Sequence, residues 1–355
     1  MTDQAPEVYV TNFNKRFTGV SSTLRAVMQQ HMGRYRSVLV GVGLPGLPEP
    51  ITKRAALRLA RQKPEGRPFA IWHVRRNTEM QLAILARDVL RLPIRTVFTS
   101  AAKHRHSAWP RFLISRMDRI IATSDEAARC VGRHDAVIPH GVDTRRFCPP
   151  EDRAAEWAKT GFPGTYGIVT VGRIRPSKGS DIFVKAMIRA LPDLPGAVAV
   201  LVGLAKPEDQ GFLAKMKAEI AAAGMEGRIF FSGSISDEAL LTILKGSRLL
   251  CATPRYEPFG VTPLEGMACG LPIVATATGH FAECVGDPGN PEEAGRIVPL
   301  EDVAAVAEGV RWALGDAANW AALSARARAR AERIFSIEGE AAGIAAIYEA
   351  LWARG

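Results

Sequence analysis

The sequence predicts an α/β protein built from two doubly wound domains, and three observations support this. The 355-residue chain is longer than one hydrophobic core usually requires, so two domains are expected. Its first half opens with a strand, a glycine-containing loop and a helix, the order in which a doubly wound unit begins. Its second half repeats this order from Tyr166 onward. We expect domains at residues 1–150 and 151–336, joined by a polar, proline-containing linker at 148–152.

Composition and hydropathy are those of a globular protein. Hydrophobic residues make up 47% of the chain and charged residues 23%, which excludes a disordered chain. The apolar stretches, such as Ala197–Ala205, are too short to span a bilayer, and the polar start Met1–Glu7 predicts no secretory leader. The five cysteines are scattered without metal-binding spacing, as expected of reduced, buried thiols. We therefore expect a cytoplasmic location.

Charge is distributed unevenly between the two halves. Residues 1–150 hold 25 Lys and Arg against 11 Asp and Glu, a net charge of +14, whereas the remainder holds 21 against 25, a net charge of −4. The first half is therefore expected to meet something anionic, such as a membrane face or a phosphorylated substrate. Nucleic acid is the weakest of these partners, because the basic residues are not interleaved with stacking aromatics. A solvated basic surface without a partner remains an open alternative.

The first half begins with a strand at Glu7–Phe13, a loop and a helix at Leu24–Met32. Gly19 in that loop lets the backbone approach a ligand, and the Ser/Thr cluster after it can cap the helix. A second strand at Ser37–Val42 is followed by a basic amphipathic helix at Ile51–Gln62. Its three arginines at helical spacing fit an anionic lipid surface or a solvated helix face, and the pattern does not choose between them. These arginines are Arg54, Arg58 and Arg61.

Polar residues follow the next two strands, at Phe69–His73 and Arg95–Thr99. Ligands of open α/β sheets bind where strands end, which makes both segments candidates for ligand contacts. The basic loop after the second strand leads to Trp109 and Phe112, which can act as interfacial anchors; zinc binding by its two histidines has little support without carboxylates or thiols nearby. The candidate ligand-binding residues of the first half, which become acceptor-binding residues if the resemblance given below holds, are His73, Arg75, Arg76, Lys103, His104, Arg105 and His106.

The second half places two cations directly after its first strand. Arg173 and Lys178 stand in a G-R-x-x-x-x-K-G pattern before a helix expected at Asp181–Leu191. Two cations at a helix N-terminus can clamp a diphosphate without metal. The continuous apolar run Ala197–Gly203 fits a parallel strand buried on both faces, and Ile229–Ile235 predicts a further strand before a capped helix.

The segment Thr253–Cys284 contains the strongest pattern in the chain. Glu257 and Glu265 have seven residues between them, with a Pro-Phe-Gly turn after the first. Free N–H groups from about Phe259 to Thr262 would form an anion-binding nest beside a short helix. Because carboxylates repel phosphate, the two glutamates are expected to accept hydroxyl groups that flank it. Helices are expected from 300 to 314, around the arginine-rich segment after it, and from 337 to 352.

This segment resembles the donor-binding motif of the GT-B glycosyltransferases of family 4, retaining enzymes that use a nucleotide-sugar. The resemblance covers nearly the whole chain and implies two Rossmann-like domains facing across a cleft. Donor binding would lie in the second domain and acceptor binding in the first, with the helix at about 337–355 packing back on the first domain. Glu257 would face the transferred sugar and Glu265 would hold the ribose.

The resemblance also assigns roles to other residues. The catalytic residues would be Arg173, Lys178 and Glu257. The donor-binding residues would be Gly19, Val20, Gly172, Arg173, Lys178, Ser234, Ile235, Glu257, Phe259, Gly260, Val261, Thr262 and Glu265. The sequence has no D-x-D motif, so neither metal nor another cofactor is expected, and the family's mechanism is a same-face displacement that needs no side-chain nucleophile.

First-half motifs such as W-H-V-R-R-N-x-E-M are similar to those of bacterial lipopolysaccharide core mannosyltransferases. That similarity implies GDP-mannose as donor and an anionic Kdo-lipid A glycolipid as acceptor, met at the cytoplasmic face of the inner membrane through the basic first domain. Two positions depart from the family: His140 replaces the usual Asn of an I-P-N-G-V-D stretch, and Phe98-Thr99-Ser100 stands where a His is common.

Alternatives remain open at this point. A family 4 transferase that uses a UDP-sugar on another glycan would share every second-half motif, because the base is read by backbone groups and shape. A nucleotide-sugar epimerase or a non-catalytic binder with the GT-B fold would belong to another class. The linkage formed, the hydroxyl attacked and the oligomeric state are not specified by the sequence.

Overall fold

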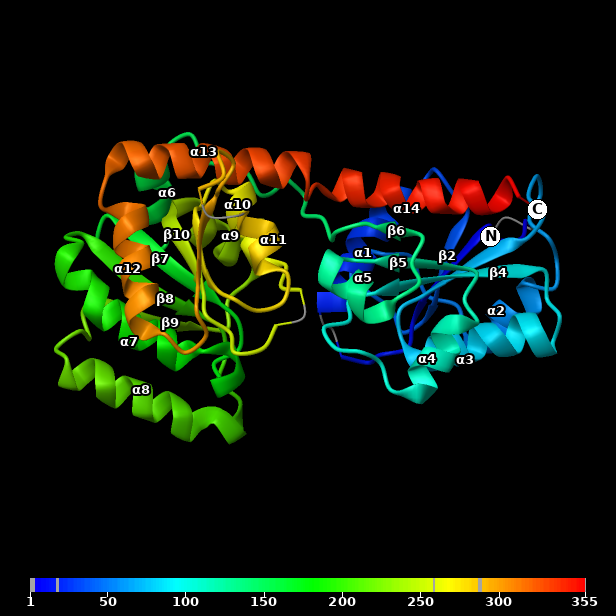
Figure 1. The fold of residues 1–355 in the computed structure, drawn as a ribbon, viewed down its shortest axis with the longest axis horizontal. Coiled ribbons are helices and arrows are strands. Elements are labelled where there is room, and N and C mark those ends of the chain that lie inside the picture. Colours follow the sequence, from blue (N-terminus) through cyan, green and yellow to red (C-terminus); the bar gives the residue numbers. More distant parts are fainter. Residues whose placement is uncertain (1–3, 17–18, 258, 287–288, 355) are drawn as a thin grey trace. The chain divides into compact units, whose positions relative to one another are not determined.

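The computed structural model describes residues 4–16, 19–257, 259–286 and 289–354, and the chain divides into two compact units (Figure 1). The first unit comprises residues 1–141 and 336–355, and the second comprises 142–335. Pro258, part of the turn expected after Glu257, lies outside the described residues. Each unit contains a six-stranded parallel sheet with helices on both faces, which is the α/β, doubly wound architecture that the sequence predicts.

The first unit has the strand order β2-β1-β3-β4-β5-β6. Its elements are β1 (Val8–Asn12), α1 (Gly19–His31), β2 (Ser37–Gly41), α2 (Lys53–Leu59), β3 (Ala70–Val74), α3 (Asn77–Ile84), the π-helical turn η1 (Leu85–Val89), β4 (Ile94–Ser100), α4 (Ala108–Ser115), β5 (Arg119–Ala122), α5 (Asp125–Val131), β6 (Ala136–Val137) and α14 (Ile337–Trp352).

Alternate strand residues of the first unit pack into two cores, as period-two side-chain geometry requires. On one face Val8 and Ile71 pack with α1 and α14; on the other Tyr9 and Trp72 pack with α2, α3 and α4. The terminal helix α14 thus supplies much of one face, with Tyr348 at 1% exposure. Its contact with α1 places it on the first unit, where the resemblance puts the terminal helix.

The second unit has the strand order β12-β11-β10-β7-β8-β9. Its elements are α6 (Arg153–Ala158), β7 (Tyr166–Val171), the 3-10 turn η2 (Pro176–Lys178), α7 (Ser180–Ala190), η3 (Leu191–Asp193), β8 (Ala197–Val202), η4 (Pro207–Asp209), α8 (Gln210–Ala222), β9 (Ile229–Gly233), α9 (Asp237–Gly246), β10 (Ser247–Ala252), α10 (Thr262–Ala268), β11 (Ile273–Thr276), α11 (Phe281–Val285), β12 (Gly295–Val298), α12 (Val303–Leu314) and α13 (Ala317–Arg333).

The second sheet is also buried on both faces. Ile168 and Leu201 face a core formed with α7, α8 and α12, while Val169 and Val200 face a core formed with α9, α10 and α11. This matches the continuous apolar runs of its strands. The strands β7 and β10 are neighbours although 75 residues separate the end of the first from the start of the second. Their adjacency brings distant segments to one edge of the sheet.

The first unit ends at Gly141, ahead of the boundary that the sequence places at 150. The reason is that residues after Gly141 bond to α13 and its C-terminal end: the Val142 N–H donates to the Phe335 carbonyl at 2.8 Å, and Arg328 donates to the Thr144 and Phe147 carbonyls. The segment 142–150 therefore belongs to the second unit.

Several element boundaries differ from the expected ones. Helix α1 begins at Gly19 rather than Leu24, and the short helix expected beside the 259–262 turn is α10, which begins at Thr262. In α10 the second position is Pro263, whose fixed φ suits the first turn of a helix. The strand β3 continues to Val74, one residue beyond the expected end at His73, so His73 lies within the strand.

Candidate active site

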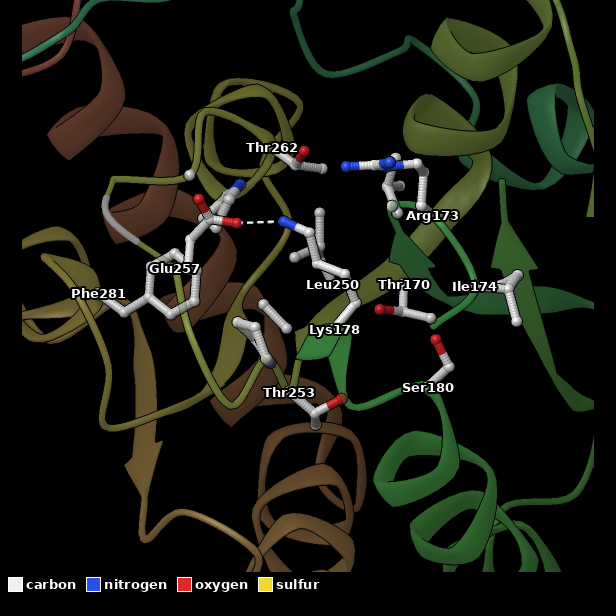
Figure 2. Close-up of a pocket in the computed structure, with 16 residues that line it drawn as sticks. Thr170, Arg173, Ile174, Lys178, Ser180, Leu250, Thr253, Glu257, Thr262 and Phe281 are labelled. Atoms are coloured by element: carbon white, nitrogen blue, oxygen red, sulfur yellow. Dashed lines mark hydrogen bonds and ion pairs between the residues drawn. The ribbon is translucent and has the colours of Figure 1, made fainter. Parts of the chain in front are cut away.

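A pocket lies at the carboxyl ends of β7 and β10, within the second unit (Figure 2). This is where open α/β sheets bind ligands. It brings together six of the residues expected to bind a donor: Gly172, Arg173, Lys178, Glu257, Gly260 and Thr262. The other residues that line it are Thr170, Val171, Ile174, Ser180, Leu250, Ala252, Thr253, Pro254, Pro263 and Phe281.

Arg173 is carried on a loop that continues the pairing of β7 with the segment after β8. The Gly172 N–H donates to the Val202 carbonyl and the Ile174 N–H to the Leu204 carbonyl, both at 2.9 Å. A Cβ at Gly203 would lie 2.0 Å from the Gly172 carbonyl oxygen, so the two segments need glycine to approach this closely. The Arg173 side chain between these bonds is exposed and makes no hydrogen bond or ion pair within the described residues.

Lys178 ends the short turn η2, and the glycine after it sets its position. Gly179 has φ +64, and a Cβ there would lie 1.7 Å from the Thr253 carbonyl oxygen. The Thr253 hydroxyl in turn donates to the Gly179 carbonyl at 2.9 Å. The start of α7 is therefore locked against the end of β10, and Lys178 is held at the junction.

An arginine outside the pocket fixes this junction from the other side. Arg255 donates to both carboxylate oxygens of Asp181, in the first turn of α7, at 2.8 Å each. Its backbone N–H also donates to the Ser177 carbonyl at 3.1 Å. Burial alone raises the pKa of the Asp181 carboxyl, but its hydrogen bonds and charge interaction with Arg255 outweigh this and lower it. Asp181 therefore stays ionised.

Lys178 and Glu257 form an ion pair inside the pocket, with side chains that are 26% and 16% exposed. Figure 2 shows this pair in the middle of the pocket, with the Arg173 guanidinium pointing toward Thr262 in the same view. Two cations and one carboxylate thus share a small, partly enclosed space. A diphosphate that entered it would compete with Glu257 for Lys178 and release the carboxylate to accept hydroxyl groups.

The turn at residues 259–262 offers backbone donors to this space. Within the described residues, the N–H groups of Gly260, Val261 and Thr262 have no protein acceptor. Gly260 has φ +80, and a Cβ there would lie 2.7 Å from the Phe281 ring and 3.0 Å from Cγ of Glu257. Free N–H groups in such a turn favour an anion, as the sequence predicts.

Glu265 lies one helical turn after Thr262 on α10, so both side chains share a face of that helix. Its carboxylate is not among the residues that line the pocket, and it makes no hydrogen bond or ion pair within the described chain. Burial raises the pKa of this carboxyl to about 7, with Arg146 opposing the shift and Asp237 adding to it. A hydroxyl donor would relieve the cost of holding this group ionised.

The remaining predicted donor residues lie away from the pocket lining. Ser234 is exposed after the end of β9, and Ile235 packs against the apolar core of the second unit. Gly19 and Val20 form the first turn of α1 in the first unit. A Cβ at Gly19 would meet no atom within 4 Å, so this glycine is not required by packing inside its own unit. Phe259 is buried beneath the pocket turn.

His73 is fully buried in the first unit. Its Nδ1 lies 2.5 Å from the Tyr348 hydroxyl and its Nε2 lies 2.7 Å from the Thr99 hydroxyl. His73 was expected at the end of the strand, but it lies within β3, where the alternation of side chains makes it face α14. Desolvation lowers the pKa of the imidazole well below its usual range. In this structure His73 has no surface to present to an acceptor.

Arg75 and Arg76 do follow the end of β3. Their backbone N–H groups both donate to the buried Glu79 carboxylate, which also accepts from the Phe13 N–H and the Thr11 hydroxyl. Within the described residues, Nη1 of Arg75 and Nη2 of Arg76 are buried without a hydrogen-bond partner. The other terminal nitrogen of Arg76, Nη1, donates to Glu79 and Asn12. Guanidinium nitrogens without a partner at a strand end are suited to an anionic group.

The basic loop at residues 101–107 carries the other expected acceptor contacts. His104 and Arg105 are exposed, and Lys103 and His106 are partly buried. Desolvation lowers the pKa of His106. In the described part of the chain there is no cluster of His, Cys, Asp or Glu side chains that could hold a metal ion.

Sequence reasoning missed Ser180, Thr253 and Phe281 as lining residues. Ser180 lies two residues after Lys178, whereas Thr253 and Phe281 reach the pocket because β10 stands next to β7 and β11 next to β10 in the sheet. That strand order is not visible in the sequence. The position of Thr253 at the end of an apolar strand was the one available signal, because polar residues at strand ends recur in ligand sites.

Comparison with known proteins identifies relatives of the whole chain. The lipopolysaccharide core biosynthesis mannosyltransferase LpsB of Rhizobium meliloti (strain 1021) is 41% identical over 348 residues, which cover 97% of each chain. A second such enzyme, LpcC of Rhizobium leguminosarum bv. viciae, is 37% identical and covers 97% of this chain and 96% of its own.

Solved structures show the same architecture. Alr3699/HepE of Anabaena, crystallised with UDP, has a TM-score of 0.82 at 18% identity and covers 97% of this chain and all of its own. The C-terminal domain of the group 1 glycosyl transferase LpcC of Francisella tularensis has a TM-score of 0.52 at 29% identity, covering 56% of this chain and all of its own.

A protein family defined by its sequence pattern also matches about half of the chain. The family described as "Glycosyl transferases group 1" matches residues 152–332, which include every residue of the pocket. This match, the relatives that span the chain and the two Rossmann-like sheets agree. The chain therefore belongs to the glycosyl transferases group 1 family and is a glycosyltransferase with the GT-B fold.

Proposed function

We propose that this glycosyltransferase moves mannose from GDP-mannose onto the Kdo-lipid A inner core of lipopolysaccharide, with retention of configuration and without metal. The observation that carries this is the pocket of Arg173, Lys178 and Glu257 in a chain that is 41% identical, over 97% of its length, to a lipopolysaccharide core mannosyltransferase. Relatives at this identity and coverage support both the sugar and the acceptor class.

The pocket chemistry supports transfer by stabilisation of the leaving group. As the bond to the anomeric carbon breaks, negative charge grows on the diphosphate. Arg173, Lys178 and the free N–H groups of residues 260–262 can stabilise that charge. Glu257, displaced from Lys178 by the diphosphate, would accept hydroxyls of the transferred sugar. A phosphate oxygen on the same face would take the proton of the attacking acceptor hydroxyl.

The first unit supplies groups suited to an anionic acceptor. The buried, unpartnered nitrogens of Arg75 and Arg76, together with Lys103 and the exposed Arg105 of the 101–107 loop, fit carboxylates or phosphates of a lipopolysaccharide core. These cations belong to a half of the chain, residues 1–150, that has a net charge of +14.

A donor panel tests the proposal first. GDP-mannose, UDP-glucose, UDP-GlcNAc and ADP-glucose are compared by thermal shift and hydrolysis, with and without EDTA. We expect selective stabilisation by GDP-mannose that EDTA does not change, followed by transfer to a Kdo-lipid acceptor with an α-linked product by NMR. Preference for a UDP-sugar would overturn the donor assignment, and an inverted product would overturn the mechanism.

We further propose that the first unit docks on anionic lipid at the inner face of the cytoplasmic membrane. Within the described residues no helix combines the length and hydrophobicity that crossing a bilayer requires. Trp109 and Phe112 on α4 are 54% and 52% exposed. Their rings stack on each other with centroids 5.6 Å apart. Aromatic side chains of this kind insert at membrane interfaces. A separate groove is lined by Leu57, Leu90, Leu92 and the three arginines of α2 and its C-terminal end, Arg54, Arg58 and Arg61.

Charge reversal tests this docking. Arg54→Glu, Arg58→Glu and Arg61→Glu together should lower cosedimentation with phosphatidylglycerol liposomes at least about a hundredfold, because each basic residue near the surface contributes about 1 kcal/mol. Lys215→Glu with Lys217→Glu, on exposed positions of α8 in the second unit, is the control and should change binding little. Equal sedimentation of the two variants would contradict the proposal.

A further inference from the structure

His280 is a buried histidine that contacts the pocket turn without lining the pocket. It stands directly before α11, after the loop that follows β11, and is 1% exposed. Its ring is stacked on Phe259, with centroids 3.7 Å apart and planes 17° apart. Its Nδ1 lies 3.2 Å from the Phe259 carbonyl oxygen. The His280 side chain thus contacts both the ring and the backbone carbonyl of Phe259, in the turn at residues 259–262.

The hydrogen bonds of His280 fix its tautomer. A carbonyl oxygen only accepts, so Nδ1 must carry the proton and donate to Phe259. Nε2 is then the acceptor, and Cys284 Sγ lies 3.0 Å from it, one turn along α11. Burial raises the pKa of the Cys284 thiol well above its usual range, which keeps its S–H available for this bond. The imidazole is therefore oriented by α11 and acts on the turn.

The neighbouring residue Phe281 contacts the other side of the same turn. Its ring leaves no room for a Cβ at Gly260, the residue after Phe259. The start of α11 therefore contacts residues 259 and 260 from two directions. The backbone N–H groups of Gly260, Val261 and Thr262, which have no acceptor within the described residues, lie at or directly after this contact.

We propose that His280 is a positioning residue for donor binding: it holds the turn at residues 259–262 so that its free N–H groups face the diphosphate. This inference rests on the proposed function of the pocket. His280 does not touch the donor, and it acts through Phe259. Its loss should therefore weaken the binding of phosphate-bearing ligands while leaving contacts to the nucleoside intact.

The experiment compares GDP and guanosine by calorimetry, on the full chain and well below the melting temperature. His280→Ala should bind GDP about tenfold more weakly than the wild type, as expected for loss of one hydrogen bond and one ring stack. Guanosine, which has no phosphate, should bind as before. His280→Asn, which keeps an N–H donor near the position of Nδ1, should recover part of the GDP affinity.

His31→Ala is the matched control. His31 is equally buried, at 4% exposure, and its Nε2 lies 2.8 Å from the Ala341 carbonyl oxygen in the first unit. The His31→Ala variant should have a lower melting temperature than the wild type and the same affinity for GDP. Unchanged GDP binding by His280→Ala, or an equal loss for GDP and guanosine, would overturn the inference. If the wild type binds neither GDP nor UDP, the proposed function fails and the inference fails with it.

Discussion

Glu265 shows at the scale of one residue how a binding site can cost stability. Its carboxyl keeps a proton up to about pH 7 in the folded chain, since burial raises its pKa from 4.5 to about 7. Between these pH values the folded state binds more protons than the unfolded state, so stability falls as pH rises. Above pH 7 the folded state bears the full free-energy cost of keeping the buried carboxylate ionised.

Glu265→Gln should therefore stabilise the free protein at pH 8 by about 1–3 kcal/mol, because one unit of pKa corresponds to about 1.4 kcal/mol and the side chain keeps some contact with water. Urea unfolding of both proteins at pH 5, 6, 7 and 8 measures this. The gain should grow from pH 5 to pH 7 and then level off. The same variant should bind the donor more weakly, as stability and function trade off. A gain independent of pH would contradict the assignment of the penalty to ionisation.

The sequence indicated the charged residues that the structure brings to one pocket, but it did not indicate how His73 lies in the first unit. Arg173, Lys178 and Glu257 are found together because each belongs to a motif whose chemistry is local to its own loop. His73 was expected at the end of a strand, where it could meet a ligand, but the alternation of side chains along β3 directs it to α14, where it contacts Tyr348. His280 gave no signal, because its partner Phe259 is 21 residues away.

At the scale of elements, the pocket depends on how closely α7 meets β10. Gly179 has a left-handed φ, and a Cβ at this position would lie 1.7 Å from the Thr253 carbonyl oxygen. Gly224 has nearly the same φ, +65, but a Cβ there would meet no atom within 4 Å. The two glycines therefore separate backbone strain from steric overlap.

Gly224→Ala should cost about 1–2 kcal/mol, the strain of a left-handed residue with a side chain. Gly179→Ala should cost about 2–5 kcal/mol, because overlap adds about 1–3 kcal/mol to that strain. It should also weaken nucleotide binding by displacing Lys178. Urea unfolding and calorimetry measure the two effects. Equal stability losses for both variants would show that α7 and β10 can separate at no cost.

At the scale of the whole molecule, the second unit is one continuous segment and the first is not. Residues 142–335 contain both cores of the second sheet and every residue of the pocket. Their ends are joined by the Val142–Phe335 hydrogen bond, so cutting there removes no internal contact of the segment. Such a segment satisfies what a domain needs to fold alone.

We expect residues 142–335 expressed alone to fold cooperatively and to bind GDP with an affinity close to that of the full chain. Residues 1–141 alone should not fold, because they lack Ile344, Tyr348 and Trp352 of the core on the α14 face. Circular dichroism and calorimetry on the two fragments measure this. A fusion that links 141 to 336 through a short Gly-Ser loop is the control and should restore the first unit. A folded 1–141 fragment would contradict the inference that the first unit needs α14 to fold.

The crossing at Gly141 has a consequence for the order in which the chain acquires its structure during synthesis. A Cβ at Gly141 would lie 2.5 Å from the Ser336 carbonyl oxygen, so the outgoing and returning segments of the first unit are pressed together. The unit whose residues leave the ribosome first is thus completed last, after the second unit has been made. Until α14 emerges, the apolar face formed by β1, β3 and α1 has no cover. The part of the enzyme that is expected to meet lipid is therefore the part that depends longest on protection from aggregation while it is being made.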